Sequence, residues 1–411
     1  MRSVTVTGAT GYVGSHFARA ARRAGWRVVA ATRHASAHAD AWVPYDLRTP
    51  AWVLDGEATP IVHLAVLAGG SDERDVEVDA AHALLQEARK HGTYVLFVSS
   101  QVARADAPTA YGRTKHAIEE RVLASGGIVV RPGLVYGGAP GGLYATLLRA
   151  ARRAVMLPAV VPPPCVQPVH VDDLAAALLR ALESPERWFG RVLHVAEPEP
   201  RPFSAWMHEL AATFGRAPWC VPIPAALVRA GTALAASIGA SSLADRARSL
   251  LAIPPMATAG DLAALGLALR SSREAFARRA ARRACVREGA ALLRYVLGAA
   301  PGPALVRRYA RAIEALRDAQ PLPLPRWGLR IPLLLRALDQ PRLRAADGEW
   351  QWRVHAAAAI AEASPQGARR FLALQGDGSR AWRIGAALAA LPVEALARAA
   401  SLALDTRRRR G

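Results

Sequence analysis

The sequence of 411 residues has few cysteines, few aromatic residues and almost no lysine. Its three cysteines, Cys165, Cys220 and Cys285, lie far apart and form no Cys-x-x-Cys pair, so neither a disulfide framework nor a zinc site is indicated. The histidines show no His-Glu-x-x-His pattern, and we therefore expect no metal. This cysteine usage fits a reducing compartment. Because no basic and then apolar leader follows Met1, we expect a cytoplasmic protein.

Long uncharged apolar runs are also missing. The longest apolar stretch, residues 221–240, contains Pro222, Pro224 and Arg229. It is therefore a poor membrane span and a reasonable buried or interfacial helix.

Negative charge is scarce, and the formal net charge is +20. Only Lys90 and Lys115 among the 53 basic residues are lysines, and most of the excess lies beyond Arg270. Such a bias toward arginine, with abundant alanine, indicates a GC-rich genome more than a selected nucleic-acid surface, so we do not expect a nucleic-acid partner. For the basic C-terminal third, a protein partner or an anionic membrane surface is the stronger expectation, and a homodimer is left open.

What the sequence has is a regular alternation of apolar strands and helices over its first 135 residues. This alternation is typical of a parallel sheet covered on both faces. We therefore expect a Rossmann-type doubly wound α/β fold with a small substrate lobe, followed by an all-α C-terminal domain. The expected strands are residues 3–7, 27–32, 60–65, 94–98, 127–131 and 192–196, and the expected helices are 11–25, 78–91 and 111–124.

A glycine-rich segment joins the first expected strand to the first helix. Gly8 would allow a tight turn, Gly11 would let a pyrophosphate approach the backbone, and Gly14 would let the helix pack close to the sheet. The free N–H groups and positive dipole end of the helix attract phosphate. The segment therefore predicts dinucleotide binding by Gly8, Thr10, Gly11, Tyr12, Val13 and Gly14.

The end of the second expected strand distinguishes the two nicotinamide cofactors. An NAD-binding domain usually places Asp or Glu there to hold the ribose hydroxyls, whereas this strand ends with Thr32, Arg33 and His34. Arg33 has the charge and geometry to pair with a 2′-phosphate, although an ordinary solvated arginine would look the same in the sequence. We favour NADP(H) over NAD(H).

Tyr111 and Lys115 have the Tyr-x-x-x-Lys spacing on an expected helix. Residues four apart share one helix face, so the ammonium would lie near the phenol and favour the phenolate. A surface tyrosine and lysine would give the same spacing by chance. The retention of a lysine in a chain that otherwise uses arginine favours a functional role for Lys115.

The order of several motifs raises the specificity of this pattern. Ser99-Ser100 closes a strand upstream, Arg131-Pro132-Gly133 follows downstream, and His63-Leu64-Ala65, Asp46-Leu47 and residues 169–175 also match. With the glycine-rich segment, this order resembles the extended short-chain dehydrogenase/reductase superfamily, in its NAD-dependent epimerase/dehydratase branch. The resemblance covers about residues 1–270.

The resemblance implies catalytic roles for three residues. Ser100 would hydrogen-bond the substrate oxygen, Tyr111 would act as general acid/base, and Lys115 would hold the nicotinamide ribose and lower the tyrosine pKa. A hydride would pass between C4 of the nicotinamide and a carbonyl or hydroxyl carbon of a small-molecule substrate.

The resemblance also implies residues around the cofactor. Asp46 and Leu47 would border the adenine, Ala65 would line the cofactor path through its backbone, and Pro132 and Gly133 would lie by the nicotinamide. Asp173 is expected to cap a helix rather than take part in the chemistry.

Two departures from the family's pattern bear on the substrate. The interval from Ser100 to Tyr111 is short for a nucleotide-sugar enzyme, and no arginine precedes His170 where such enzymes tend to carry one. The chain is nearer to branches that resemble the 3β-hydroxysteroid dehydrogenases or the NADPH-binding accessory subunit of respiratory complex I. We therefore expect an oxidoreductase, with an epimerase or dehydratase on a sugar-like substrate, or a non-catalytic NADPH-binding scaffold, as alternatives.

The C-terminal third contains an internal repeat. Residues 352–361 and 382–391 share the pattern Trp-Arg-x-x-Ala-Ala with a period of 30. This resembles HEAT-like helical repeats, although two alanine-rich helices could look alike through composition alone. We expect two domains, residues 1–285 for the dinucleotide and substrate and residues 286–411 for the helical, HEAT-like part.

Overall fold

The computed structural model describes residues 2–50, 59–67, 74–237, 248–324, 326–339 and 348–368, with residues 385, 388–389, 391–392 and 394–399. The chain packs as two compact units, one formed by residues 1–212 and 216–276 and the other by residues 213–215 and 277–411. The division falls inside helix α10, Ser272–Leu297, which also contains the expected boundary at residue 285. No helix in the described part of the chain is both long and apolar enough to span a bilayer.

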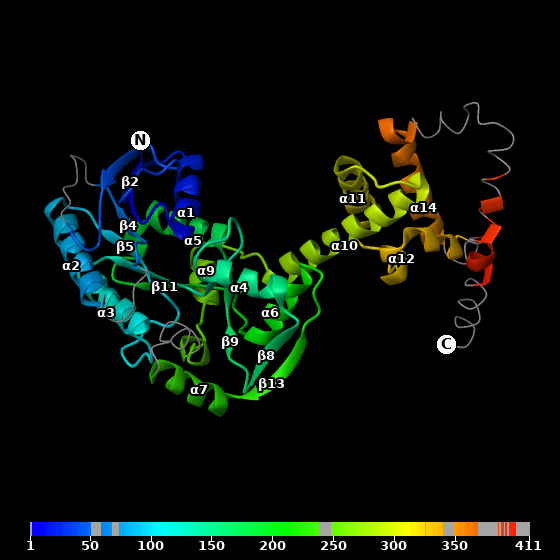
Figure 1. Ribbon diagram of the computed structural model, residues 1–411. Coiled ribbons are helices and arrows are strands. Elements are labelled where there is room, and N and C mark those ends of the chain that lie inside the picture. Colours follow the sequence, from blue (N-terminus) through cyan, green and yellow to red (C-terminus); the bar gives the residue numbers. More distant parts are fainter. Residues whose placement is uncertain are drawn as a thin grey trace. The chain divides into compact units, whose positions relative to one another are not determined.

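The first unit is built on a parallel seven-stranded sheet with the order β11-β6-β5-β4-β1-β2-β3 (Figure 1). The order reverses between β1 and β4, so a crevice for a ligand is expected where the carboxyl ends of these two strands meet. The strands are β1 Ser3–Thr7, β2 Arg27–Thr32, β3 Ala41–Pro44, β4 Ile61–His63, β5 Val95–Val98, β6 Ile128–Pro132 and β11 Val192–Val195.

Two apolar cores cover the two faces of this sheet. On one face, helices α1 (Tyr12–Arg23) and α5 (Val171–Glu183) pack with α9 (Ala259–Ala264). On the other face, helices α2 (Arg74–Lys90) and α3 (Ala110–Ala124) pack through Leu84, Leu85, Ile118 and Val122. The apolar strands are therefore buried on both sides, as a doubly wound fold requires. This confirms the Rossmann-type fold expected from the sequence.

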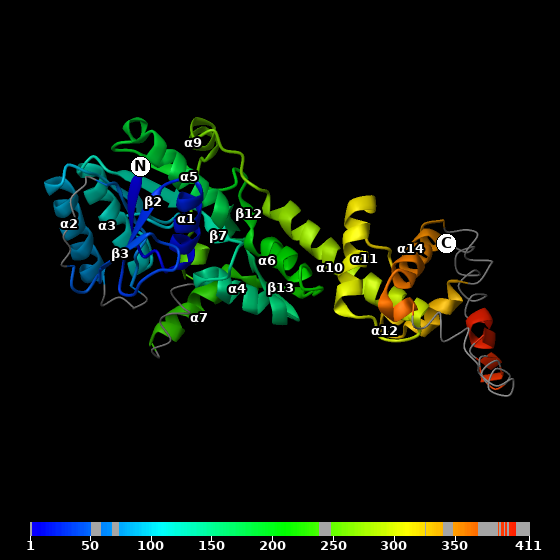
Figure 2. The ribbon, with the colours of Figure 1, turned by 90° about the horizontal axis from the view of Figure 1, so that it is seen from above.

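Short paired strands and helices form the lobe that was expected to hold the substrate. The pairs are β7 (Leu134–Tyr136) with β10 (Pro168–His170), β9 (Cys165–Val166) with β12 (Arg201–Pro202), and β8 (Met156–Val161) with β13 (Trp219–Pro224). The helices are α4 Gly142–Arg153, α6 Phe203–Ala212 and α7 Ala225–Ser237, with a 3₁₀ turn, η2, at Pro185–Arg187. Figure 2 shows α4, α6 and β13 together on one side of the lobe.

The second unit is helical, as expected. It contains most of α10 with α11 (Pro303–Arg317), α12 (Arg326–Arg330), η3 (Pro332–Ala337) and α14 (Gly348–Glu362). Its apolar core includes Leu292, Ile313 and Val354, and a buried Arg353 pairs with Glu288 at 3.2 Å. The first copy of the predicted repeat lies in α14. Most of the second copy, residues 382–391, falls outside the described residues, so the HEAT-like assignment stays a prediction.

A buried amide joins the lobe to the sheet. The Gln167 side chain is fully buried, and its Oε1 accepts hydrogen bonds from Gln101 Nε2 at 3.0 Å and from the Met256 N–H at 2.7 Å. Its Nε2 donates to the carbonyls of Glu197 and Met256, at 3.1 and 2.9 Å. One side chain therefore satisfies backbone groups from two separate loops, whose polar atoms would otherwise be buried without partners.

Replacing this amide should be costly. We expect Gln167→Leu to lower the free energy of unfolding by about 3 kcal/mol, because it leaves buried donors and acceptors unpaired. Urea denaturation of the full chain measures the change. Gln86→Leu, at an exposed position on α2, is the control and should change stability by less than about 0.5 kcal/mol. Equal effects of the two substitutions would contradict the role given to Gln167.

Candidate active site

The glycine-rich turn after β1 is closely packed. Gly8 has a φ of 69°, and a Cβ added there would lie 2.8 Å from the Ala65 nitrogen. A Cβ at Gly14 would lie 2.1 Å from the Gly8 carbonyl oxygen, so helix α1 can approach the turn only with glycine at this position. Gly11, in contrast, is exposed, and a Cβ there would meet only the Gly8 oxygen, at 3.1 Å.

The start of α1 is suited to a phosphate group. Its N-cap is Gly11, no side chain caps it, and its first turn carries no acidic residue. The N–H groups of this turn therefore face no competing side-chain acceptor, and the helix dipole adds to the attraction for an anion. Thr10 is exposed, and Tyr12 and Val13 are partly buried in the same turn. These residues fit the diphosphate of a dinucleotide.

A hydrogen-bonded bridge joins the ends of β1 and β4. The Thr7 Oγ1 lies 2.8 Å from His63 Nδ1 and accepts from the N–H groups of Leu64 and Ala65, at 3.1 and 3.2 Å. These bonds turn the chain away from the ladder after His63, which is why β4 ends two residues before the expected strand did. Ala65 is thereby held directly beside Gly8.

The other predicted cofactor residues lie along the same edge of the sheet. Arg33 is exposed just after β2, with no side-chain partner among the described residues. Asp46, whose Oδ1 accepts from the Arg48 N–H at 3.0 Å, and the buried Leu47 follow β3. Pro132 ends β6, and at Gly133 a Cβ would lie 1.9 Å from the Gln167 carbonyl oxygen. All of them follow carboxyl ends of parallel strands, where ligands of this fold bind.

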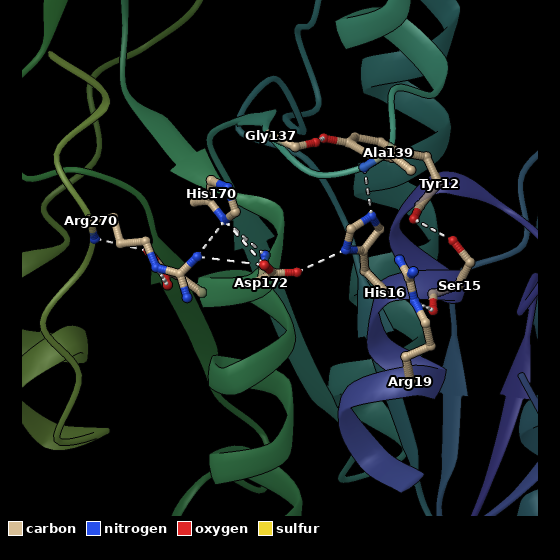
Figure 3. A network of polar contacts seen from close by, with 10 residues as sticks. Tyr12, Ser15, His16, Arg19, Gly137, Ala139, His170, Asp172 and Arg270 are labelled. Carbon is tan, nitrogen blue, oxygen red and sulfur yellow. Dashed lines mark hydrogen bonds and ion pairs between the residues drawn. The ribbon is translucent and has the colours of Figure 1, made fainter. Parts of the chain in front are cut away.

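A polar network braces the first turn of α1 against the substrate lobe (Figure 3). The Tyr12 hydroxyl donates to the Gly137 carbonyl at 2.8 Å, and His16 Nε2 accepts from the Ala139 N–H at 3.3 Å. His16 Nδ1 therefore carries the hydrogen that it donates to Asp172 Oδ1, at 2.8 Å. Nothing in the sequence pattern indicated this network, because its members lie more than 120 residues apart.

Asp173 does not cap its helix. The N-cap of α5 is His170, whose ring accepts from the Asp172 N–H at 3.2 Å. Asp173 instead lies in the first turn and accepts from the Arg270 N–H at 2.8 Å, with an ion pair to the Arg270 Nε at 3.1 Å. The expectation for Asp173 was wrong because the histidine one turn earlier takes the capping position.

The structure brings Ser100, Tyr111 and Lys115 together. Ser100 follows β5, and its side chain hydrogen-bonds the Tyr111 hydroxyl. Tyr111 and Lys115 lie one turn apart on α3, which Thr109 caps by accepting from the Gly112 N–H. The Lys115 Nζ is buried, 4.7 Å from the centre of the Phe97 ring and 5.8 Å from that of Tyr111. Cation–π attraction to both rings partly offsets its lost hydration.

The electrostatics around Tyr111 differ from the expectation. Burial of the hydroxyl raises the pKa of Tyr111, the hydrogen bond with Ser100 lowers it, and the charge of Glu77 raises it, with a net shift upward. Burial likewise lowers the pKa of Lys115, against the negative charges of Glu77 and Glu119. The structure therefore does not show the lowering of the Tyr111 pKa that was expected from Lys115, because burial raises this pKa by more than the hydrogen bond with Ser100 lowers it.

Two carboxylates near Lys115 were missed in the sequence. Glu77 on α2 is 8% exposed, and its Oε1 accepts from the Leu67 N–H at 2.7 Å. Glu119 is buried one turn after Lys115 and pairs with Arg131 of β6 at 2.7 Å. Glu77 occupies the same helix face as the buried Ala81 and Ala88. An acidic residue on an otherwise apolar helix face was the sequence signal that could have indicated its role.

Comparison with known proteins agrees with this geometry. Residues 4–196 match the NAD dependent epimerase/dehydratase family. The chain is 32% identical over 197 residues to a ceramide reductase from Caulobacter vibrioides, a match that covers 44% of this chain and 61% of that protein. The chain therefore spans about three fifths of the length of that relative.

Solved structures share the fold. The crystal structure of gox2253 superposes with a TM-score of 0.54 at 20% identity, covering 67% of this chain and 96% of that chain. The human epimerase family protein SDR39U1 with NADPH superposes with a TM-score of 0.53 at 18% identity, covering 68% and 99%. These structures show the fold alone, and the match to the family model covers residues 4–196.

The buried His63 predicts a pH dependence. Burial, with the positive charge of Lys115, lowers the pKa of His63 to about 3. The unfolded chain, with a histidine pKa of 6.5, binds this proton at a higher pH than the folded chain does. Stability should therefore fall as the pH drops from 6.5 toward 3, by up to about 1.4 kcal/mol per pH unit from this residue.

Urea denaturation across this pH range measures the effect. His63→Asn keeps an acceptor for the Thr7 hydroxyl but cannot ionise, so it should flatten the slope. His82→Asn, at an exposed position on α2, should leave the slope as it is. An unchanged slope in His63→Asn would show that other groups carry the pH dependence.

Proposed function

We propose that this chain is an NADP(H)-dependent oxidoreductase that reduces a carbonyl carbon, with Tyr111 as the proton donor. The observation that carries the proposal is the proximity of Ser100 to the Tyr111 hydroxyl at the carboxyl edge of the sheet, with the buried Lys115 one helical turn from Tyr111. A bound NADPH supplies the hydride at this edge. Ser100 positions the substrate oxygen by hydrogen bonding, and Tyr111 gives that oxygen its proton.

The raised pKa of Tyr111 supports the reductive direction. A general acid must hold its proton at the working pH, and this phenol, whose ordinary pKa of about 10 is raised further here, holds it. The name of the 32%-identical relative, ceramide reductase, points the same way. We therefore propose a carbonyl on a long-chain lipid, such as a ketone-bearing ceramide, as the substrate.

The preference for NADP(H) rests on the end of β2. Arg33 is exposed there, and the next carboxylate along the chain, Asp40, already pairs with Arg22 at 2.9 Å. No acid among the described residues directly after β2 is therefore placed to hold ribose hydroxyls, whereas the guanidinium can take a 2′-phosphate. SDR39U1, which shares the fold, was solved with NADPH.

Replacing the tyrosine tests the chemistry. We expect Tyr111→Phe to lower kcat for NADPH oxidation with a ketone-bearing ceramide by about a hundredfold or more, because the proton donor is lost. NADPH affinity, measured by calorimetry, should stay nearly the same. The control is Tyr94→Phe, which removes the hydroxyl of a tyrosine that precedes β5 and lies outside the site.

The alternatives give different results in this assay. Turnover of a substrate without net consumption of NADPH would show an epimerase or dehydratase, which returns the hydride. If the chain binds NADPH and its cellular role survives Tyr111→Phe, it is a scaffold without turnover.

Replacing the arginine tests the cofactor preference. We expect Arg33→Ala to weaken NADPH binding by about tenfold or more while leaving NADH binding nearly unchanged, since a charge-assisted pair is lost only with the phosphorylated cofactor. Arg27→Ala, at the opposite end of β2, is the matched control. Equal weakening of both cofactors would remove Arg33 from the 2′-phosphate site.

A further inference from the structure

An exposed apolar face lies on the substrate lobe. It is formed by β8, β13 and α7, and we refer to it as the lobe face. Trp219 is 77% exposed, Met156 64%, Val161 55% and Leu227 64%. Every residue of β13 except the partly buried Ile223 is exposed, although the strand reads Trp-Cys-Val-Pro-Ile-Pro. Figure 1 shows β13 and α7 following one another along the outer edge of the lobe.

The exposure of several large apolar side chains on one face is unusual. Scattered apolar residues on a surface need no explanation, but a contiguous exposed patch marks an interaction site. Strand β8 packs against α6 and β13, whereas β13 pairs with β8 alone among the described residues, which leaves its other edge open there. A tryptophan with one end in apolar surroundings and its N–H near water is typical of the boundary of a lipid bilayer.

The charge around the lobe face selects the partner. No Asp or Glu occurs between Glu120 and Asp172, or between Glu209 and Asp245, the two segments that contain the whole face. Four arginines of these two segments, Arg149, Arg153, Arg216 and Arg229, are exposed, and none forms an ion pair with a described carboxylate. Sequence segments that carry apolar side chains and arginines but no acid complement an anionic membrane, since each arginine near such a surface adds to the binding.

The lobe face is connected to the active site. The Thr232 carbonyl of α7 accepts from Arg248 NH2 at 3.1 Å, and the neighbouring Ser249 Oγ lies 3.2 Å from Thr109 Oγ1. Thr109 is the N-cap of α3, two residues before Tyr111. Three residues after Ser249, the Ala252 carbonyl accepts from Arg104 NH1 at 2.7 Å. Helix α7 is therefore linked to the N-cap of α3 through the segment that contains Arg248 and Ser249.

We infer that the lobe face docks on the surface of an anionic lipid bilayer, with Trp219 and Leu227 inserted at the interface and the arginines against the headgroups. This attachment presents the substrate lobe to molecules dissolved in the membrane. The link to catalysis rests on the proposed lipid substrate, whereas the docking itself needs neither cofactor nor turnover. A failure of the proposed reaction would therefore leave the docking result intact, and the reverse also holds.

Vesicle flotation tests the docking. The full chain should float with vesicles of equimolar phosphatidylcholine and phosphatidylglycerol, and only weakly with phosphatidylcholine alone. Trp219→Ser together with Leu227→Ser should weaken the partition at least about tenfold, because the apolar area no longer leaves water. Leu316→Ser, at a leucine of α11 that is 59% exposed, is the matched control and should float like the original chain.

A second pair of variants tests the charge. Arg149→Gln with Arg153→Gln should weaken binding to the anionic vesicles by about twenty-five-fold, at roughly fivefold for each arginine removed. Arg307→Gln with Arg308→Gln, two adjacent exposed arginines of α11, is the control. If this control loses as much binding as the lobe variants, the basic C-terminal helices hold the membrane and the inference fails.

The exposed Cys220, next to Trp219, allows a direct measurement. In a Cys165→Ser chain it is the exposed cysteine that remains, because Cys285 is buried. An environment-sensitive fluorophore on Cys220 should shift to shorter wavelength on addition of the anionic vesicles. An unshifted spectrum would overturn the inference. So would a sedimenting dimer that the Trp219→Ser change dissociates without any vesicle binding, since the lobe face would then join two copies of the chain.

Discussion

The first unit depends on the close approach of three backbone segments at the ends of β1 and β4. The Thr7 hydroxyl bridges His63, Leu64 and Ala65, while Gly8 and Gly14 allow the turn and helix α1 to come within contact. Any side chain at these glycines would separate the strands from the helix. Because the sheet order reverses at this point, the packing constraint and the ligand crevice coincide, and the start of α1 stays free of capping side chains.

The buried ammonium of Lys115 organises the second half of the site. Taking a charge out of water is unfavourable, and here the rings of Phe97 and Tyr111 and the carboxylates of Glu77 and Glu119 surround it. Burial shifts the pKa values of two neighbouring groups, His63 and Tyr111, in opposite directions. It keeps His63 neutral, so that Nδ1 can pair with Thr7, and it keeps the Tyr111 phenol protonated. A protonated phenol and a neutral structural histidine therefore lie close to the same buried ammonium.

The sequence predicted what depends on local pattern. Strands Ser3–Thr7 and Arg27–Thr32 were predicted with their observed bounds, and the spacing of Tyr111 and Lys115 placed both on one face of α3. Features set by tertiary contacts were not predictable in this way. Burial reverses the expected shift of the Tyr111 pKa, His170 takes the cap assigned to Asp173, and Gln167 joins loops distant in sequence. The periodicity of a sequence does not show which distant residues are buried together.

The burial of Lys115 has a consequence for the reactivity of the molecule. Lysine occurs at only two positions, and of these only Lys90 presents its amine to solvent. Acylating reagents, and enzymes that modify lysine side chains, therefore meet one lysine target, on the surface of α2. Modification of Lys115 would require α3 to separate from the sheet. The rate at which that amine becomes acylated thus reports how often α3 separates from the sheet.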